Sequence, residues 1–410
     1  MPLNVVVVCD YASALGGAEK VAIDSSRGLA EASLKVHYIA GLGPVDAALT
    51  HPNVTVHLGD VQDLKHKSRA DLLMSGLWSA GCARMAATVL AALPRGETII
   101  HVHSWQRALT AAVLRACQRS GHPLVMTLHE YGTACPNQGF YDYQRHQICT
   151  RKALGPACLA THCDTRTYAH KLWRASRTAL QRVAAGMPGE VRDVIYISQL
   201  SRDVLSPYFE PSTRWHAVRN PIPLTPAPRV AAEANRDFLF VGRVSTEKGA
   251  ELFAAAAARA GVSAVVAGDG PQLPALRSAY PGLNFLGWLD AAGVQRAMRS
   301  ARALVFPSLW YETLGMSVQE ALACGVPVIV ADRTAASESV VAGENGVLFS
   351  HHDVAHLAAR LAELATDDAT IARMSAAAYA RYWSDPPTLD RHVQALQGVY
   401  RQCVVAGAAS

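Results

Sequence analysis

The chain has 410 residues, of which 50% are hydrophobic and 17% charged. Its length predicts two or three domains with sizeable cores. The apolar run at the N-terminus is too short for a signal peptide and lacks a basic lead-in, and no stretch reaches the length of a membrane span. We therefore expect a cytoplasmic protein whose nine cysteines are mostly thiols.

The net charge of +5 is unevenly distributed along the chain. Residues 143–192 hold nine Lys and Arg residues against only Asp164 and Glu190. Such a basic patch can face an anionic membrane surface or an acceptor that carries a pyrophosphate. We expect no nucleic-acid partner, because no nucleic-acid-binding motif accompanies the charge.

Strand and helix patterns alternate through the first half, which indicates a parallel sheet. We expect residues 1–220 to form one Rossmann-like, doubly wound domain that begins with a buried strand. The expected strands lie near 3–9, 35–40, 98–102, 123–128 and 193–197, and the expected helices near 17–31, 69–93, 105–119, 166–185 and 200–206.

Gly16 and Gly17 follow the first expected strand and open the first helix. Glycines there let the backbone approach a phosphate closely, and the helix dipole favours negative charge. The pattern is not GxGxxG, so it does not support a dinucleotide site. An ordinary strand-to-helix turn explains the pair equally well.

Three histidines lie at the ends of neighbouring strands. His129, followed by Glu130, ends the strand at 123–128, and His101 and His103 end the strand before it. A lone histidine is more often a structural hydrogen-bonding group than a catalyst. His103 could line the same cleft as His129, whereas a structural role is favoured for His101.

Four of the nine cysteines fall in an insertion at about 132–165 that shows little regular pattern. Four thiolates in tetrahedral geometry would suit a structural zinc ion. The spacing contains no CxxC, so free thiols or a disulfide remain open alternatives. The four residues are Cys135, Cys149, Cys158 and Cys163.

The segment 166–185 predicts a basic amphipathic helix. Such a helix can lie on a bilayer surface. We favour the alternative, in which its apolar residues pack on its own domain and its charges are solvated.

Four prolines within residues 221–230 predict a semi-rigid linker, because proline fixes φ and removes a hydrogen-bond donor. The alternation then restarts and predicts a second doubly wound domain over 231–385. Residues 386–410 should contain a last helix with a periodic apolar face. The second set of strands is expected near 237–241, 263–267, 283–285, 303–306, 326–330 and 346–348.

Two short segments of the second domain carry the chemistry. Gly242 and Arg243 follow a buried strand, and Lys248 opens the next helix, so the two cations suit a diphosphate. Glu312 and Glu320 follow a later strand, eight residues apart. Carboxylates at the carboxyl end of a parallel strand face the ligand crevice and accept hydrogen bonds from sugar hydroxyls.

Together with the run Gly-Val-Pro-Val-Ile-Val-Ala-Asp at 325–332, these segments resemble the retaining glycosyltransferases of family four. The match covers most of residues 238–350. It implies the GT-B fold, in which two Rossmann-like lobes face a cleft and the C-terminal helix crosses back to the first lobe.

The resemblance assigns catalytic and donor-binding roles to residues of both lobes. Glu312 would hold the donor sugar, Glu320 the donor ribose, and His129 would contact the transferring sugar. Glu130 departs from the family, which has Asp after this histidine. The leaving diphosphate would be surrounded by Arg243, Lys248, Gly16, Gly17, Gly242, Leu314, Gly315 and Met316.

The implied reaction is sugar transfer from a UDP- or GDP-sugar to a hydroxyl acceptor, with retention at the anomeric carbon. The chain has no Asp-x-Asp, so we expect metal-independent transfer without a catalytic cofactor. We expect a saccharide acceptor, lipid-linked and part of a bacterial surface polysaccharide, at an anionic membrane surface. The alternatives are a sugar-nucleotide epimerase or hydrolase of the same fold and a non-catalytic sugar-nucleotide-binding protein.

Overall fold

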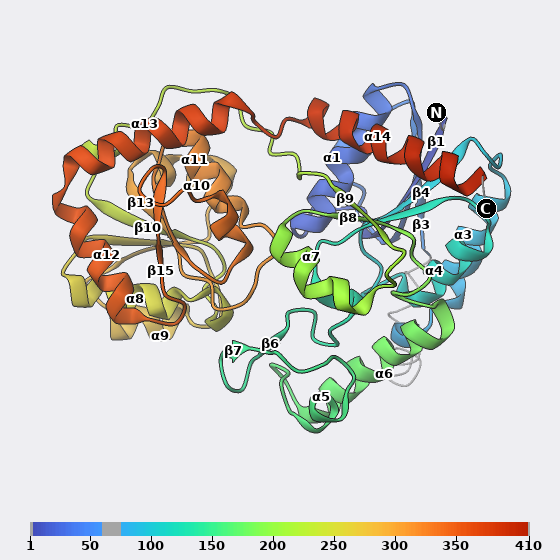
Figure 1. Ribbon diagram of the computed structural model, residues 1–410, viewed down its shortest axis with the longest axis horizontal. Helices are drawn as coiled ribbons and strands as arrows, with labels where there is room; N and C mark the ends of the chain where they lie inside the picture. The colour runs from blue at the N-terminus through green and yellow to red at the C-terminus, as the bar shows by residue number, and fades with distance from the viewer. Residues whose placement is uncertain (1–2, 60–74, 409–410) are drawn as a thin grey trace.

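The computed structural model describes residues 3–59 and 75–408, which form two α/β lobes side by side (Figure 1). Each lobe has a fully parallel sheet with helices on both faces. The predicted fold class is confirmed. The first-lobe sheet has the order β3-β2-β1-β4-β5-β8-β9, and the second-lobe sheet has the order β12-β11-β10-β13-β14-β15.

Apart from β3 and β9, the strands follow the alternation predicted from the sequence. In the first lobe they are β1 Asn4–Tyr11, β2 Lys35–Leu42, β3 Val54–Leu58, β4 Thr98–Val102, β5 Leu124–Thr127, β8 Asp193–Tyr196 and β9 Arg214–Ala217. In the second they are β10 Asp237–Val241, β11 Ala264–Ala267, β12 Asn284–Gly287, β13 Ala301–Phe306, β14 Val328–Ala331 and β15 Gly346–Phe349.

The helices cover both faces of each sheet. In the first lobe they are α1 Gly17–Glu31, α3 Ala80–Ala91, α4 Thr110–Arg119, α5 Pro156–Ala160, α6 Tyr168–Ala185 and α7 Gln199–Leu205. The others are α8 Ala250–Ala260, α9 Leu273–Ala279, α10 Ala291–Arg299, α11 Met316–Cys324, α12 Val354–Thr366, α13 Asp368–Ser384 and α14 Leu389–Ala408. Within the described ranges, no helix is both long and apolar enough to cross a bilayer.

The strand β1 lies inside the first-lobe sheet, between β2 and β4, and both of its faces are covered. Val6 and Val8 pack in the core under α3 and α4, whereas Val5 and Val7 pack in the core under α1 and α14. Successive side chains of a strand point to opposite faces, so a doubly covered strand must be apolar throughout.

Two predicted helices differ from the structure. The helix expected at 105–119 starts only at Thr110, because the buried Asp10 carboxylate accepts hydrogen bonds from the backbone N–H groups of residues 107–109 and holds them in a turn. The helix expected at 69–93 lies partly outside the described residues; α3 begins at Ala80, where the Ser79 side chain caps it.

The edge strands β3 and β9 were not predicted. Their residues include Thr55, His57, Arg214 and His216, and they are partly exposed. An edge strand covered on one side carries a weaker apolar signal than a central strand.

The last helix crosses back to the first lobe, as the resemblance implied (Figure 1). Val393, Leu396 and Tyr400 of α14 are buried in the first-lobe core, where this helix packs against α1 and β5. The Tyr400 hydroxyl also lies 2.7 Å from His101 Nδ1, which supports the structural role expected for this histidine. Where α14 begins, the Ile222 N–H donates to the carbonyl of Pro387, so the two chain segments that join the lobes lie side by side.

The helix α6 packs on its own lobe, but not through the face predicted. Its buried residues include Ala175, Thr178 and Gln181, and Gln181 accepts a hydrogen bond from the Trp105 indole. Leu172 and Val183 are instead exposed. The spacing of apolar residues predicted the wrong buried face. The helix α6 packs closely on α4, and small and polar residues fit this contact.

The α1–α14 contact depends on Gly28. A Cβ atom at this position would lie 2.7 Å from Val393 and 3.0 Å from Leu389. We predict that Gly28→Ala lowers the free energy of unfolding by about 1–3 kcal/mol, since overpacking outweighs the gain in helix propensity. Gly398→Ala, in α14 with no atom within 4 Å of the added Cβ, should instead stabilise by up to about 1 kcal/mol. Urea unfolding measures both, and equal effects would contradict the packing argument.

Candidate active site

The cleft between the lobes contains a hollow of about 580 Å³. Its walls come from both sheets at the carboxyl ends of their strands, where parallel α/β sheets bind ligands. All the predicted catalytic and donor-binding residues except Glu320 line it. They are Gly16, Gly17 and His129 from the first lobe, and Gly242, Arg243, Lys248, Glu312, Leu314, Gly315 and Met316 from the second.

The two lobes touch across this hollow. The Thr313 hydroxyl donates to the His129 carbonyl at 3.0 Å, and the Tyr131 hydroxyl donates to the Glu312 carbonyl at 2.6 Å. A Cβ atom on Gly17 would lie 3.7 Å from Met316 Sδ, so the two predicted diphosphate loops face each other at close range.

Lys248 is held by a tight turn behind it. Gly249 has φ of +73°, and a Cβ atom there would lie 2.0 Å from the Pro307 carbonyl oxygen. Only glycine tolerates both the left-handed backbone and this approach. The turn therefore fixes the Lys248 backbone against the segment that leads to Glu312.

Lys248 and Glu312 form an ion pair of 2.7 Å between Nζ and Oε1. The Ser308 hydroxyl donates to the same oxygen at 2.6 Å. Burial raises the pKa of Glu312, but the Lys248 charge and these hydrogen bonds outweigh it, so the pKa is lowered and the carboxylate is ionised.

Glu312 has φ of +53°, in the left-handed region that side-chain-bearing residues rarely adopt. Such strain persists only where the surroundings over-determine it, and it concentrates at functional sites. Its carboxylate is thereby presented to Lys248 rather than to bulk solvent.

Ser308 and Trp310 also belong to this site, and sequence reasoning did not single them out. The Lys248 ammonium lies 5.1 Å from the centre of the Trp310 ring, within cation–π range. Positions 308, 310 and 312 alternate along one short loop. This spacing places their side chains on the same side of an extended segment, and it could have identified Ser308 and Trp310.

His129 is held by a second histidine. Its Nε2 lies 2.9 Å from His103 Nδ1, and the two rings are stacked. Burial lowers the pKa of His129 to about 3, so its ring is neutral at physiological pH. A neutral imidazole can donate a hydrogen bond at one nitrogen and accept one at the other.

The first-lobe wall adds a carboxyl group and a cation that were not predicted as site residues. Glu130 and Arg107 both line the hollow. Burial raises the pKa of Glu130 to about 7, although the charge of Arg107 opposes the rise. Asp10 presents Arg107 by holding its backbone N–H in the turn before α4.

Glu320 lies on α11, outside the residues that line the hollow. Burial raises its pKa, and the charge of Lys20 across the cleft opposes that rise. A second hollow of about 630 Å³ shares Gly242 and Arg243 with the first and extends to Trp288, a residue that is 74% exposed.

The four insertion cysteines are free thiols, and Cys135, Cys158 and Cys163 are buried. The Cys135 thiol donates to Asn137 Oδ1 at 2.9 Å. Among the residues that the structure describes, no three of these sulfur atoms come within 4.8 Å of one another. The four thiols nevertheless lie near one another, since Cys163 and Cys149 raise the pKa of Cys135, and Cys158 and Cys149 raise that of Cys163, after burial as the larger cause. The structural zinc stays a prediction.

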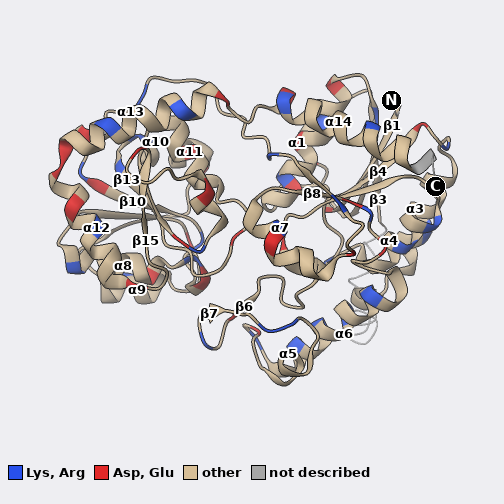
Figure 2. Ribbon diagram, viewed as in Figure 1, with Lys and Arg blue, Asp and Glu red and all other residues tan. Residues whose placement is uncertain are grey.

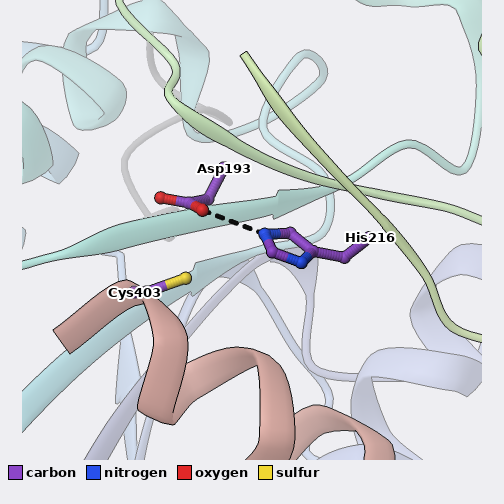
Figure 3. Close-up of side chains that lie close together, drawn as sticks. All are labelled: Asp193, His216 and Cys403. Carbon is purple, nitrogen blue, oxygen red and sulfur yellow. Dashed lines mark hydrogen bonds and ion pairs between the residues drawn. The ribbon is translucent and has the colours of Figure 1, made fainter. Parts of the chain in front are cut away.

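Asp193, His216 and Cys403 do come this close, and they are the one such group within the described ranges (Figure 3). The Asp193 carboxylate, however, already accepts hydrogen bonds from Arg214 Nε at 2.7 Å and His216 Nε2 at 2.9 Å. Burial raises the pKa of Asp193, but these partners lower it to about 2. A guanidinium on the same carboxylate opposes a metal cation, so we interpret the group as a structural ion pair under α14.

Two family models match the chain. Residues 15–225 match Glycosyltransferase Family 4, and residues 235–367 match Glycosyl transferases group 1. The chain belongs to Glycosyltransferase Family 4, and it is a glycosyltransferase of the GT-B type.

Individual relatives agree with this class. A GDP-mannose-dependent alpha-mannosyltransferase of Corynebacterium glutamicum is 31% identical over 46% of this chain, and the chain spans only 45% of that relative. A D-inositol 3-phosphate glycosyltransferase of Thermobispora bispora is 27% identical over 94% of this chain and 91% of its own length. The crystal structure of Anabaena HepE in complex with UDP and glucose has a TM-score of 0.68 at 17% identity, covering 98% of this chain and 100% of that one.

Because the pKa of Glu130 is raised in the folded state, we predict that the stability of the protein depends on pH. Its neutral form favours the folded state, so the stabilisation is complete below the ordinary pKa of 4.5 and is lost as the pH rises through about 7. Glu130→Gln should remove this loss, and the melting temperature of the variant relative to the wild type should rise between pH 5 and pH 8. The gain is at most about 3 kcal/mol. Parallel melting curves across that range would contradict the assignment.

Proposed function

We propose that this protein transfers a glycosyl unit from a nucleoside diphosphate sugar to a hydroxyl group of an acceptor, with retention at the anomeric carbon. The observation that carries the proposal is the convergence of Arg243, Lys248, Glu312 and the start of α11 on one hollow that Gly16 and Gly17 close from the other lobe. This set suits a sugar linked to a diphosphate, because it joins cations and backbone amides to a carboxylate.

The leaving diphosphate determines what the site must stabilise. Arg243 and Lys248 would balance its developing charge, together with the N-terminal amides of α11. Lys248 is bound to Glu312 here, so the donor phosphate would compete for the ammonium and free the carboxylate for a sugar hydroxyl. With two cations at the leaving group, transfer would not require a metal ion.

Retention is supported by the state of the carboxylates. Glu312 is engaged by Lys248 and Ser308, which suits binding rather than nucleophilic attack. Attack would then come from the face of the leaving group, and a phosphate oxygen would take the acceptor proton. The neutral His129 would hold a hydroxyl of the transferring sugar.

The donor is a UDP- or GDP-sugar. The hollow that extends from Arg243 to Trp288 offers an exposed aromatic ring for the base. The relatives point both ways, since one uses GDP-mannose and a similar structure holds UDP. Glu320 would accept hydrogen bonds from the ribose.

The acceptor is a lipid-linked saccharide of a bacterial surface polysaccharide, reached from the cytoplasmic side of the membrane. Support comes from the first lobe, where α3, α4 and α6 carry blue basic positions (Figure 2). A groove of about 650 Å³ between α3 and α4 has an apolar floor and four arginines, and the exposed Leu172 and Val183 lie on the neighbouring α6. Cations beside exposed apolar groups suit an anionic bilayer. The arginines are Arg84, Arg95, Arg115 and Arg119.

Incubation with radiolabelled UDP- and GDP-sugars and a lipid extract tests the function. Label in a saccharide or lipid product supports transfer. Free sugar would indicate a hydrolase or epimerase, and binding without turnover would indicate a non-catalytic protein.

We predict that Arg243→Ala and Lys248→Ala each lower turnover by about 100-fold or more, because each removes charge stabilisation at the leaving group. Arg259→Ala, an exposed cation on α8, is the control and should leave turnover unchanged. Near-normal transfer by the double variant Arg243→Ala/Lys248→Ala would show that these two cations do not stabilise the leaving diphosphate.

Glu320→Ala should weaken nucleotide binding by about 10-fold, the loss expected from one charge-assisted hydrogen bond. Isothermal titration with UDP and GDP measures the affinity. An unchanged affinity for both nucleotides would show that Glu320 does not bind the donor ribose.

A further inference from the structure

The insertion of the first lobe reaches across to the second lobe. Its β6 (Tyr141–Asp142) and β7 (Gln147–Ile148) form a short hairpin below the two sheets (Figure 1). Tyr141 is fully buried and belongs to the hydrophobic core of the second lobe, and Tyr143 packs against the same core. The insertion therefore packs on both lobes, since Phe140 and Ala153 belong to the first-lobe core.

The insertion is anchored from within. The Asn137 side-chain amide donates to the carbonyls of Tyr141 and Cys163, at 2.7 Å and 3.2 Å. Tyr141 and Tyr143 also lie close enough to Glu247 for its charge to raise their pKa values, after burial as the larger cause. Glu247 directly precedes Lys248, so the anchored tyrosines face the turn that carries this cation.

One contact links the insertion to the donor site. A Cβ atom on Gly139 would lie 2.9 Å and 3.1 Å from two carbon atoms of the Trp310 ring. The backbone of Gly139 is not in the left-handed region, so this contact, rather than a special φ, requires glycine. Any side chain at position 139 would therefore displace the indole ring of Trp310.

The indole in turn contacts the reactive pair. The Lys248 ammonium lies 5.1 Å from its ring centre and 2.7 Å from Glu312. The lysine side chain has four flexible carbon–carbon bonds, so its position depends on what surrounds the ammonium. If a donor phosphate drew the ammonium from Glu312, the ring would be the remaining partner among these two.

We propose that Trp310 is a positioning residue for Lys248 and Glu312, and that the insertion holds its ring in place through Gly139. The proposal rests on the proposed function, because it assigns the pair to the donor. The insertion thereby makes a first-lobe segment a determinant of the second-lobe donor site.

The test compares Trp310→Phe, Trp310→Leu and Gly139→Ala with the wild type. Phenylalanine keeps a ring face for the ammonium, whereas leucine removes it. Turnover should fall by about 10- to 100-fold in Trp310→Leu and Gly139→Ala, the cost of displacing a catalytic group by about 1 Å, and by less than about 3-fold in Trp310→Phe. The acceptor KM should not change.

Gly282→Ala is the matched control, since no atom lies within 4 Å of its added Cβ and its φ is not in the left-handed region. It should match the wild type. Thermal melting identifies a variant that is merely unfolded, and the two Trp310 variants keep the test valid if Gly139→Ala does not fold.

Titration with UDP and GDP gives a second readout that does not require transfer. Binding should weaken in Trp310→Leu and Gly139→Ala but not in Trp310→Phe. If the wild type transfers sugar and Trp310→Leu equals it in turnover and binding, the positioning role is wrong while the function stands. If the wild type binds neither nucleotide and transfers nothing, the proposed function is wrong and this inference with it.

Discussion

The ion pair between Lys248 and Glu312 is the interaction on which the proposed donor site depends. It joins two segments that follow different strands of the second sheet, and both arrive through constrained backbone. Gly249 is pressed against the Pro307 carbonyl, and Glu312 is held in a left-handed conformation. A buried carboxylate without a cation would cost several kcal/mol, so the two groups stabilise each other only while this geometry is kept.

The arrangement of the lobes follows from contacts made close to that pair. The hydroxyls of Thr313 and Tyr131 donate across the cleft to backbone carbonyls. Further along, the Glu338 carboxylate accepts hydrogen bonds from the N–H groups of Gln199 and Leu200 at the start of α7. These bonds hold the two lobes together over the hollow in the arrangement that the structure shows. A closed cleft of this kind would exclude water from a reactive donor.

Two features of the first lobe, the paired histidines and the insertion, determine how this lobe surrounds the hollow. His103 orients His129 from the neighbouring strand. The insertion buries Tyr141 in the opposite lobe, and its cysteines lie among protein hydrogen-bond partners such as Asn137. The first lobe therefore contributes one wall of the hollow and, through the insertion, contacts the second lobe that forms the other wall.

The sequence by itself determined the two parallel sheets and most of the residues around the hollow, whereas the crossing of the last helix came from the family resemblance. The sequence could do so because strand periodicity and residues at strand ends are local features, and parallel strands bring their carboxyl ends to one edge. The edge strands β3 and β9, the buried face of α6 and the turn before α4 were decided by packing, which overrode the local pattern.

Only the tertiary structure brought Gly139 to Trp310, paired Lys248 with Glu312 and placed Glu320 outside the hollow. Each of these depends on the contact of segments far apart in the chain, and a contact of that kind leaves no period or spacing in the sequence.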